Sequence, residues 1–134
     1  MAWQNPVFDR TAADVAACAE KCYFSPELLN RIEGNTHWLA EKYGVFMSAP
    51  RSWSSTDFLT INQMQRILSE ADAVRTACRL PPGVWVVPAF PAVTWQAVND
   101  LEHLQWKLYD IWQRNQADVL YVNEAYAGEQ IGVL

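Results

Sequence analysis

Three stretches of this chain begin with a serine or threonine and continue with apolar residues at three- and four-residue spacing. They are segments 25–44, 60–78 and 94–113. A hydroxyl side chain can accept the free amides of a first helical turn, and apolar residues at this spacing form one face of an amphipathic helix. The sequence therefore predicts a mainly α fold. We expect an antiparallel helical bundle of three long helices and one short helix, with long ordered loops and room for a small C-terminal β-ribbon.

The second expected helix has the strongest start and stop signals. Ser25 can be the N-cap, Pro26 stands where a missing amide costs nothing, and Gly44 suits the C-cap. Asn35 falls on the inner side of this helix, so its amide needs a hydrogen-bonding partner.

The short first helix has weaker signals. Asp9 or Thr11 can cap it, and it is expected to end near Cys22. Its apolar stripe is thin, so it would hardly be stable in isolation.

The connections between the long helices are long for a compact bundle. Segments 45–59 and 80–93 both contain tryptophan, phenylalanine and valine, so we expect them to be ordered. The runs VWVV at 84–87 and VLYV at 119–122 have the β-branched and aromatic composition of short strands.

The size and composition of the chain are typical of one folded domain. It has 134 residues, of which 51% are hydrophobic. We expect a single helical domain over residues 1–134. It would comprise an N-terminal arm at 1–9, the bundle at 10–116 and a C-terminal arm or hairpin at 117–134.

The charge distribution argues against two classes of partner. The net charge is −5 and the ten lysines and arginines are scattered, so neither nucleic acid nor an anionic membrane surface is an expected partner. No apolar run approaches the ~18–20 residues of a membrane-spanning helix. The first residues lack the features of a secretion signal. We expect a protein that stays in the cytoplasm where it is made.

The sequence offers few residues for catalysis or metal binding. Cys18 and Cys22, with Cys78 and either His37 or His103, could form a tetrahedral zinc site, but a buried cysteine that acts as a small apolar residue is commoner. Neither histidine lies in a motif of nucleophilic or metal-assisted catalysis, and nucleotide-binding motifs are missing. We predict no enzyme activity, no cofactor and no metal.

The seven tryptophans are the most distinctive part of the composition. Trp53 and Trp85 lie in expected loops, where an indole can bind another protein or stack on a sugar ring, or can fold back to seal the end of the bundle. The residues that we predict to make intermolecular contacts are Trp3, Trp53, Trp85, Phe90, Tyr121 and Tyr126.

Five segments together resemble a known group of proteins. They are PVFDRTAADV (6–15), LLNRIEGNTHWLAEKYG (28–44), SWSSTDFLTINQMQRI (52–67), TWQAVNDLEHL (94–104) and YAGE (126–129). In this order they resemble small proteins or modules encoded in phage and prophage tail regions of Gram-positive bacteria. The motifs that carry the resemblance are Asp9-Arg10-Thr11, Asn30-Arg31-Ile32-Glu33, Trp53 with Thr56 and Thr60, and Tyr126 to Glu129. The chain departs from the group in its higher tryptophan content and in its VWVVPAFPAV connection.

The resemblance implies a component of a virion or tail particle and brings no catalytic residues with it. The function expected is that of a non-enzymatic structural or adaptor protein, with other tail or baseplate proteins and further copies of itself as partners. Segments 3–8, 84–90 and 119–134 are apolar without helical patterning, so they are the candidates for contact between copies. Two alternatives stay open: a tail module that binds a host surface glycan or receptor through loop tryptophans, and a small regulatory protein that binds a host protein.

Overall fold

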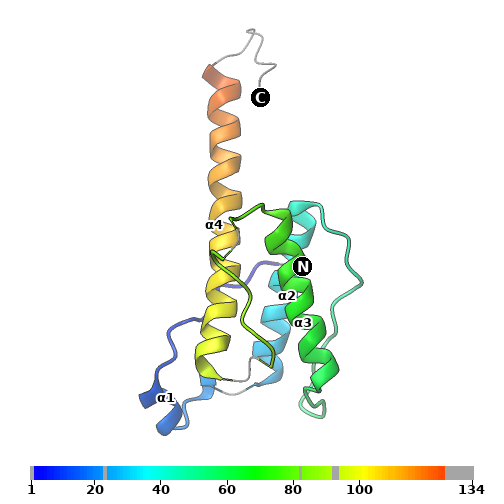
Figure 1. The fold of residues 1–134 in the computed structure, drawn as a ribbon, viewed down its shortest axis with the longest axis vertical. Helices are drawn as coiled ribbons and strands as arrows, with labels where there is room; N and C mark the ends of the chain where they lie inside the picture. The colour runs from blue at the N-terminus through cyan, green and yellow to red at the C-terminus, as the bar shows by residue number, and fades with distance from the viewer. Residues whose placement is uncertain (1, 23, 82, 92–93, 126–134) are drawn as a thin grey trace.

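The computed structural model describes residues 2–22, 24–81, 83–91 and 94–125, with side chains as far as residue 115. These residues form a short helix α1 (Ala12–Ala16), a 3-10 turn η1 (Glu20–Cys22) and the long helices α2 (Pro26–Tyr43), α3 (Ile61–Ala77) and α4 (Trp95–Ala125). They contain no strand. The predicted mainly α class, with three long helices and a short one, is confirmed (Figure 1).

The predicted starts of the long helices are confirmed by their caps. The hydroxyls of Ser25, Thr60 and Thr94 each accept a hydrogen bond from the backbone N–H three residues later. Gly44 ends α2 in the left-handed conformation, with φ of 73°, which a residue without a side chain adopts at little cost.

The first helix is shorter than predicted. Thr11 and Asp14 cap it reciprocally, each accepting a hydrogen bond from the backbone of the other. The helix stops at Ala16, and the chain resumes helical turns only in η1. Neither element contains a buried residue, so tertiary packing does not support a longer helix there.

Helices α2 and α3 run in the same direction. Near the start of both helices, Glu33 accepts a hydrogen bond from Arg66, and at their far ends Tyr43 accepts one from Cys78. The paired residues advance together along the two helices. The helices are therefore parallel, and the predicted antiparallel order is wrong.

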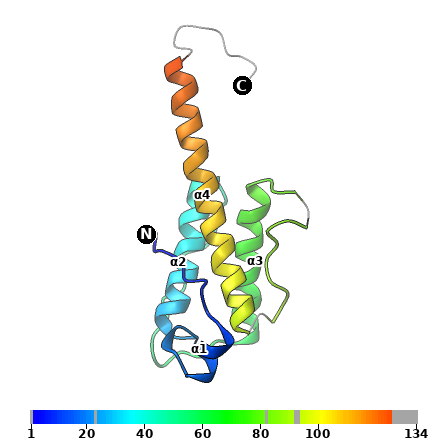
Figure 2. The ribbon, with the colours of Figure 1, turned by 90° about the vertical axis from the view of Figure 1, so that its left-hand side faces the viewer.

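Helix α4 is also parallel to α2. Glu102 pairs with Arg31 near the start of α2, and Trp112 packs edge-on against Trp38 farther along. All three long helices therefore begin at one end of the molecule, where α1 also lies (Figures 1 and 2).

The long connections permit this direction. Segments 45–59 and 80–93, called here the first and second crossover, each return the chain from the end of one helix to the start of the next (Figure 1). A helix of 17 or 18 residues is about 26 Å long, and some fifteen extended residues can span that length easily. A short turn would have forced an antiparallel pair.

The core lies between the three long helices, and α2 packs against both of the others. The stripe predicted for α2 is confirmed, because Leu28, Ile32, Asn35 and Leu39 are all buried. The other buried apolar residues of the helices are Leu29, Ala40, Met64, Ile67, Leu68, Ala71, Val74, Val98, Leu101, Leu104 and Leu108.

Helix α4 differs from the prediction at its C-terminal end. It continues to Ala125, well past the expected end of the bundle at residue 116, because segment 113–125 has neither proline nor glycine. The strand predicted at 119–122 is therefore wrong, and the rest of the predicted ribbon lies outside the described residues. The strand predicted at 84–87 is also wrong, because Val84 and Trp85 lie in a bend and Trp85 has a left-handed φ of 51°.

Candidate interaction surfaces

Most of the buried charged groups tie elements of the chain to each other. The carboxylate of Glu102 on α4 is fully buried and accepts hydrogen bonds from Arg10 at 2.7 Å and from Arg31 at 2.6 and 3.0 Å. It also accepts the backbone N–H of Val7 at 3.2 Å. The oxygens of Glu102 are thus occupied by the N-terminal arm and α2. This arrangement stabilises the fold and leaves little capacity for a substrate.

A second buried acid ties α2 to α3 and to the first crossover. The carboxylate of Glu33 accepts hydrogen bonds from Arg66 on α3 and from the indole of Trp53. The hydrogen bond to Glu33 raises the pKa of the Arg66 guanidinium above its ordinary value. Asn30 completes the contact by bonding both the backbone N–H and the carbonyl of Trp53. Trp53 is therefore an internal anchor.

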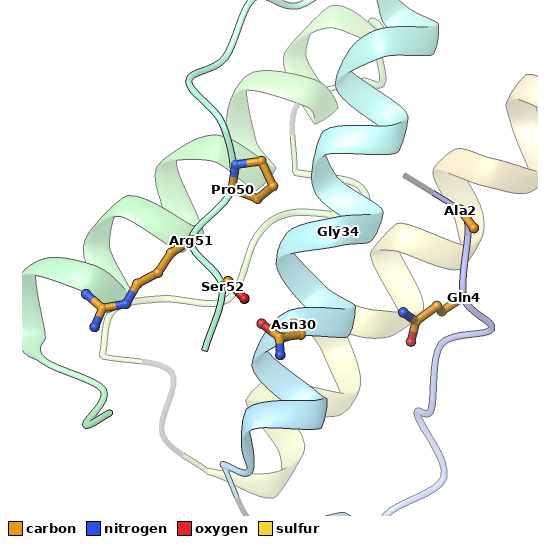
Figure 3. Close-up of a pocket in the computed structure, with 7 residues that line it drawn as sticks. All are labelled: Ala2, Gln4, Asn30, Gly34, Pro50, Arg51 and Ser52. Carbon is orange, nitrogen blue, oxygen red and sulfur yellow. The ribbon is translucent and has the colours of Figure 1, made fainter. Parts of the chain in front are cut away.

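A hollow of about 280 Å³ lies over α2, between the N-terminal arm and the first crossover (Figure 3). Its lining residues are Ala2, Gln4, Asn30, Gly34, Pro50, Arg51 and Ser52. The side chain of Arg51 points away from it, pairing with Asp57 and covering the ring of Trp53. The Asn30 amide is engaged as well, by the backbone of Trp53. With Arg51 turned away, the hollow has no described charged group directed into it to bind or transform a ligand.

An aromatic cluster joins the N-terminal arm to α2 and α4. The ring of Trp3 stacks on Tyr109 with centroids 4.3 Å apart, and Trp38 packs against both rings. Trp112 extends the cluster along α4, and the ammonium group of Lys42 lies over the rings of Trp38 and Trp112. The rings mainly pack on one another, so this cluster holds the arm in place.

A second group of rings surrounds His103 on α4. Phe8 stacks on His103 at 4.5 Å, and Trp85 meets it edge-on at 4.7 Å. Trp106 beside it is 39% exposed. The histidine therefore packs among aromatic rings.

The second crossover carries an exposed apolar edge. Val84 and Val86 are 45% and 54% exposed, whereas Trp85 and Val87 between and after them pack toward the core. Phe90 farther along is also exposed.

The structure places the predicted contact residues in different environments. Trp53 is only 4% exposed, which matches the alternative that the loop tryptophan folds back onto the bundle. Trp3 and Trp85 are half-buried within the aromatic groups, and Phe90 is exposed. Tyr121 lies in the part of α4 whose side chains are not described, and Tyr126 lies outside the described residues.

Three strongly exposed apolar residues were missed by the sequence analysis. Phe46 and Phe58 are 96% and 84% exposed, and Ile61 is 69% exposed. Phe46 and Phe58 lie in the first crossover, outside the apolar stripes of the helices. Their place outside the stripes is the feature of the sequence from which their exposure could have been predicted. Ile61 occupies the first residue of α3, where the helix begins beyond the packed core.

The cysteines are not gathered into a site. Cys18 is exposed, whereas Cys78 is half-buried and donates to the Tyr43 hydroxyl. Burial raises the pKa of that hydroxyl, and the Cys78 contact adds to the effect. Within the described part of the chain, no group of three or more histidine, cysteine or acidic side chains is placed to hold a metal ion.

Comparison of the chain with protein-family models, with curated proteins and with solved structures finds no match. Among the described helices, none is both long and apolar enough to cross a membrane. The functional argument therefore rests on the surfaces of the chain itself.

Proposed function

We propose that this chain is a non-enzymatic structural or adaptor protein of a phage or prophage tail, which works through contacts with other tail or baseplate proteins and with copies of itself. The resemblance to tail-region proteins supplies the setting. One observation on the fold supports the mode of action: α4 projects far beyond the helices that it packs against (Figures 1 and 2).

The projection has a physical consequence. Helix α4 has 31 residues and is about 46 Å long, whereas α2 and α3 are about 26 Å long. The last turns of α4 have no described neighbour. An isolated helical segment of this length is marginal in water, so contact with another molecule would stabilise it.

The buried charges also favour an architectural role. Glu33 and Glu102 are engaged with arginines inside the fold, and they contribute to holding arm, crossover and helices together. The groups left at the surface include large apolar side chains, which suit contacts with other proteins.

The test is to purify tail particles from the bacterium that encodes the chain and to quantify the protein by mass spectrometry. We expect it at a constant ratio to other tail proteins through successive gradient purifications. Chemical cross-links from α4 to another tail protein would identify the neighbour. Recovery only in the particle-free fraction would contradict the proposal.

The two alternatives predict different results. A glycan-binding module based on Trp53 and Trp85 is disfavoured by the burial of Trp53. Titration with cell-wall fragments should leave the tryptophan fluorescence unchanged. If the chain were instead a regulatory protein that binds a host protein through its acidic surface, it would capture that host protein from lysate at low salt. High salt would then release the host protein.

A further inference from the structure

The backbone of the N-terminal arm, residues 2–10, is bound by side chains of α2 and α4. The amide of Asn35 on α2 bonds the N–H and the carbonyl of Gln4 at 2.9 and 2.8 Å. The amide of Asn99 on α4 bonds the same two groups of Arg10 at 3.2 and 2.9 Å. The two helices therefore present side chains that are placed to hold an extended segment.

Two side chains of the arm anchor it on the helices. Arg10 is 3% exposed, and its guanidinium donates to the carboxylate of Glu102 at 2.7 Å. The ring of Trp3 stacks on Tyr109 with centroids 4.3 Å apart. The arm-binding surface is thus formed by four helix residues, which are Asn35, Asn99, Glu102 and Tyr109. These residues belong to the packed helices, so the surface can bind an arm from either of two copies.

The segment that joins the arm to η1 is weakly held. In residues 11–19, called here the hinge segment, only Asp14 and Ala19 are partly buried and the others are exposed. The hinge segment includes α1, which lies to the side of the long helices (Figure 1). A helix of five residues gains little stability by itself in water. Opening the hinge segment therefore gives up little tertiary packing.

The hinge segment also contains backbone strain. Cys18 has a left-handed φ of 57° although it carries a side chain. This conformation is disfavoured by about tenfold for a residue with a Cβ atom. A hollow of about 230 Å³ between Val7 of the arm, Lys21 of η1 and Arg31 of α2 shows that this end of the molecule is loosely packed. An extended hinge segment would release the strain at Cys18.

The hinge segment is long enough for the arm to leave its own copy. Nine extended residues span up to about 32 Å, which exceeds the length of α2 at about 26 Å. With the hinge segment extended, the arm can lie on the arm-binding surface of a neighbouring copy. The contacts of Trp3, Gln4 and Arg10 then form between copies as they form within one chain.

We infer that residues 2–10 exchange between two copies, so that the arm of each copy lies on the arm-binding surface of the other. The inference rests on the proposed function and specifies its self-association. Reciprocal exchange leaves neither arm nor either arm-binding surface unoccupied. It therefore gives a closed pair with twofold symmetry.

The hinge segment sets the balance between single and paired chains, because the arm contacts are the same in both. Within one copy, a short linker gives the arm an effective concentration in the millimolar range. Release of the strain at Cys18 favours the pair by about tenfold in each of the two copies. We therefore expect pairs at protein concentrations of about ten micromolar and above.

The first test measures the mass of the full chain by analytical ultracentrifugation between about one micromolar and one millimolar, with a reducing agent present. Cys18→Gly removes the strain from the single chain, because glycine adopts the left-handed conformation freely. The dissociation constant of the pair should therefore rise about tenfold or more. Cys18→Ala is the matched control, since it removes the thiol and keeps the Cβ atom. It should pair as the unmodified chain does.

The second test identifies the exchanged segment. Gln4 is exposed and lines the hollow over α2 with Asn30 and Gly34, so a photoreactive phenylalanine analogue at position 4 lies beside α2. Monomers of this chain with ¹⁴N and with ¹⁵N are mixed in equal amounts, concentrated and irradiated, and the paired fraction is digested. Because copies pair at random, about half of the cross-links from the arm to α2 should join the two isotopes.

Three results would each overturn the inference. They are an unmodified chain that stays monomeric throughout the concentration range, a Cys18→Gly variant that pairs as strongly as Cys18→Ala, and pairs whose cross-links join only one isotope. The isotope test does not depend on a variant of the hinge, so a change of folding in Cys18→Gly would not affect it. None of these results would remove the protein from purified tail particles, which is the separate test of the proposed function.

Discussion

Polar side chains within a single stretch of α2 connect this helix to four other parts of the molecule. They are Asn30, Arg31, Glu33, Asn35 and Thr36. Their partners lie on the first crossover, α4, α3 and the N-terminal arm. Buried hydrogen bonds of this kind contribute modestly when made, but a buried partner left unpaired is costly. At the scale of single residues, these contacts specify how the elements fit together.

Replacement of Glu102 tests this view most directly. Glu102→Ala leaves Arg10, itself 3% exposed, without its buried counter-charge. Removal of one partner of a buried ion pair costs about 3–5 kcal/mol, so urea denaturation should show a loss of that order in the free energy of unfolding. Glu41→Ala, an exposed change on the same chain, is the control and should stay within about 0.5 kcal/mol. Equal effects of the two changes would refute the structural role of Glu102.

At the scale of whole elements, two asparagines of α2 attach two extended segments in the same way. Asn30 bonds the N–H and the carbonyl of Trp53 in the first crossover, and Asn35 bonds the same two groups of Gln4 in the N-terminal arm. Each amide thus replaces the pairing that a neighbouring strand would provide. The extended segments lie on the helices without a sheet.

The paired asparagines make a matched test of local stability. Asn30→Ala should speed hydrogen exchange near Trp53 and leave the arm near Gln4 unchanged, and Asn35→Ala should do the reverse. A lost pair of hydrogen bonds corresponds to about 1–3 kcal/mol of local protection. Each variant serves as the control for the other in hydrogen–deuterium exchange mass spectrometry. Exchange that rises in both segments in either variant would show that they open as one unit.

At the scale of the whole molecule, the parallel order of the helices gives it two different ends. One end gathers the starts of all three long helices, and α4 alone projects from the other (Figure 2). The surface contacts available at the two ends are therefore unlike.

Truncation separates the projection from the folded body. A chain that stops after Asn115 keeps the described core, so its free energy of unfolding should fall by no more than about 1 kcal/mol. A chain that stops after Lys107 loses Leu108, which is 1% exposed, together with Trp112, and should be destabilised by more than about 3 kcal/mol. Thermal and urea denaturation of dilute samples compare the two. Similar losses in both truncations would mean that residues 116–134 belong to the core.

Local features of the chain were sufficient to predict where the three long helices begin. Ser25, Thr60 and Thr94 begin helices because a cap needs only a side chain and the amide three residues away. The burial of Asn35 followed from its place on the apolar stripe. The burial of Trp53 did not, because its partner Glu33 is twenty residues distant and no local pattern joins them.

The order of residues thus establishes where the long helices begin and which faces they bury, since capping and amphipathic spacing act over a few residues. It does not establish the direction in which the helices pack. Long crossovers permit both directions, and the parallel arrangement is selected by distant contacts such as Arg31 with Glu102 and Glu33 with Arg66.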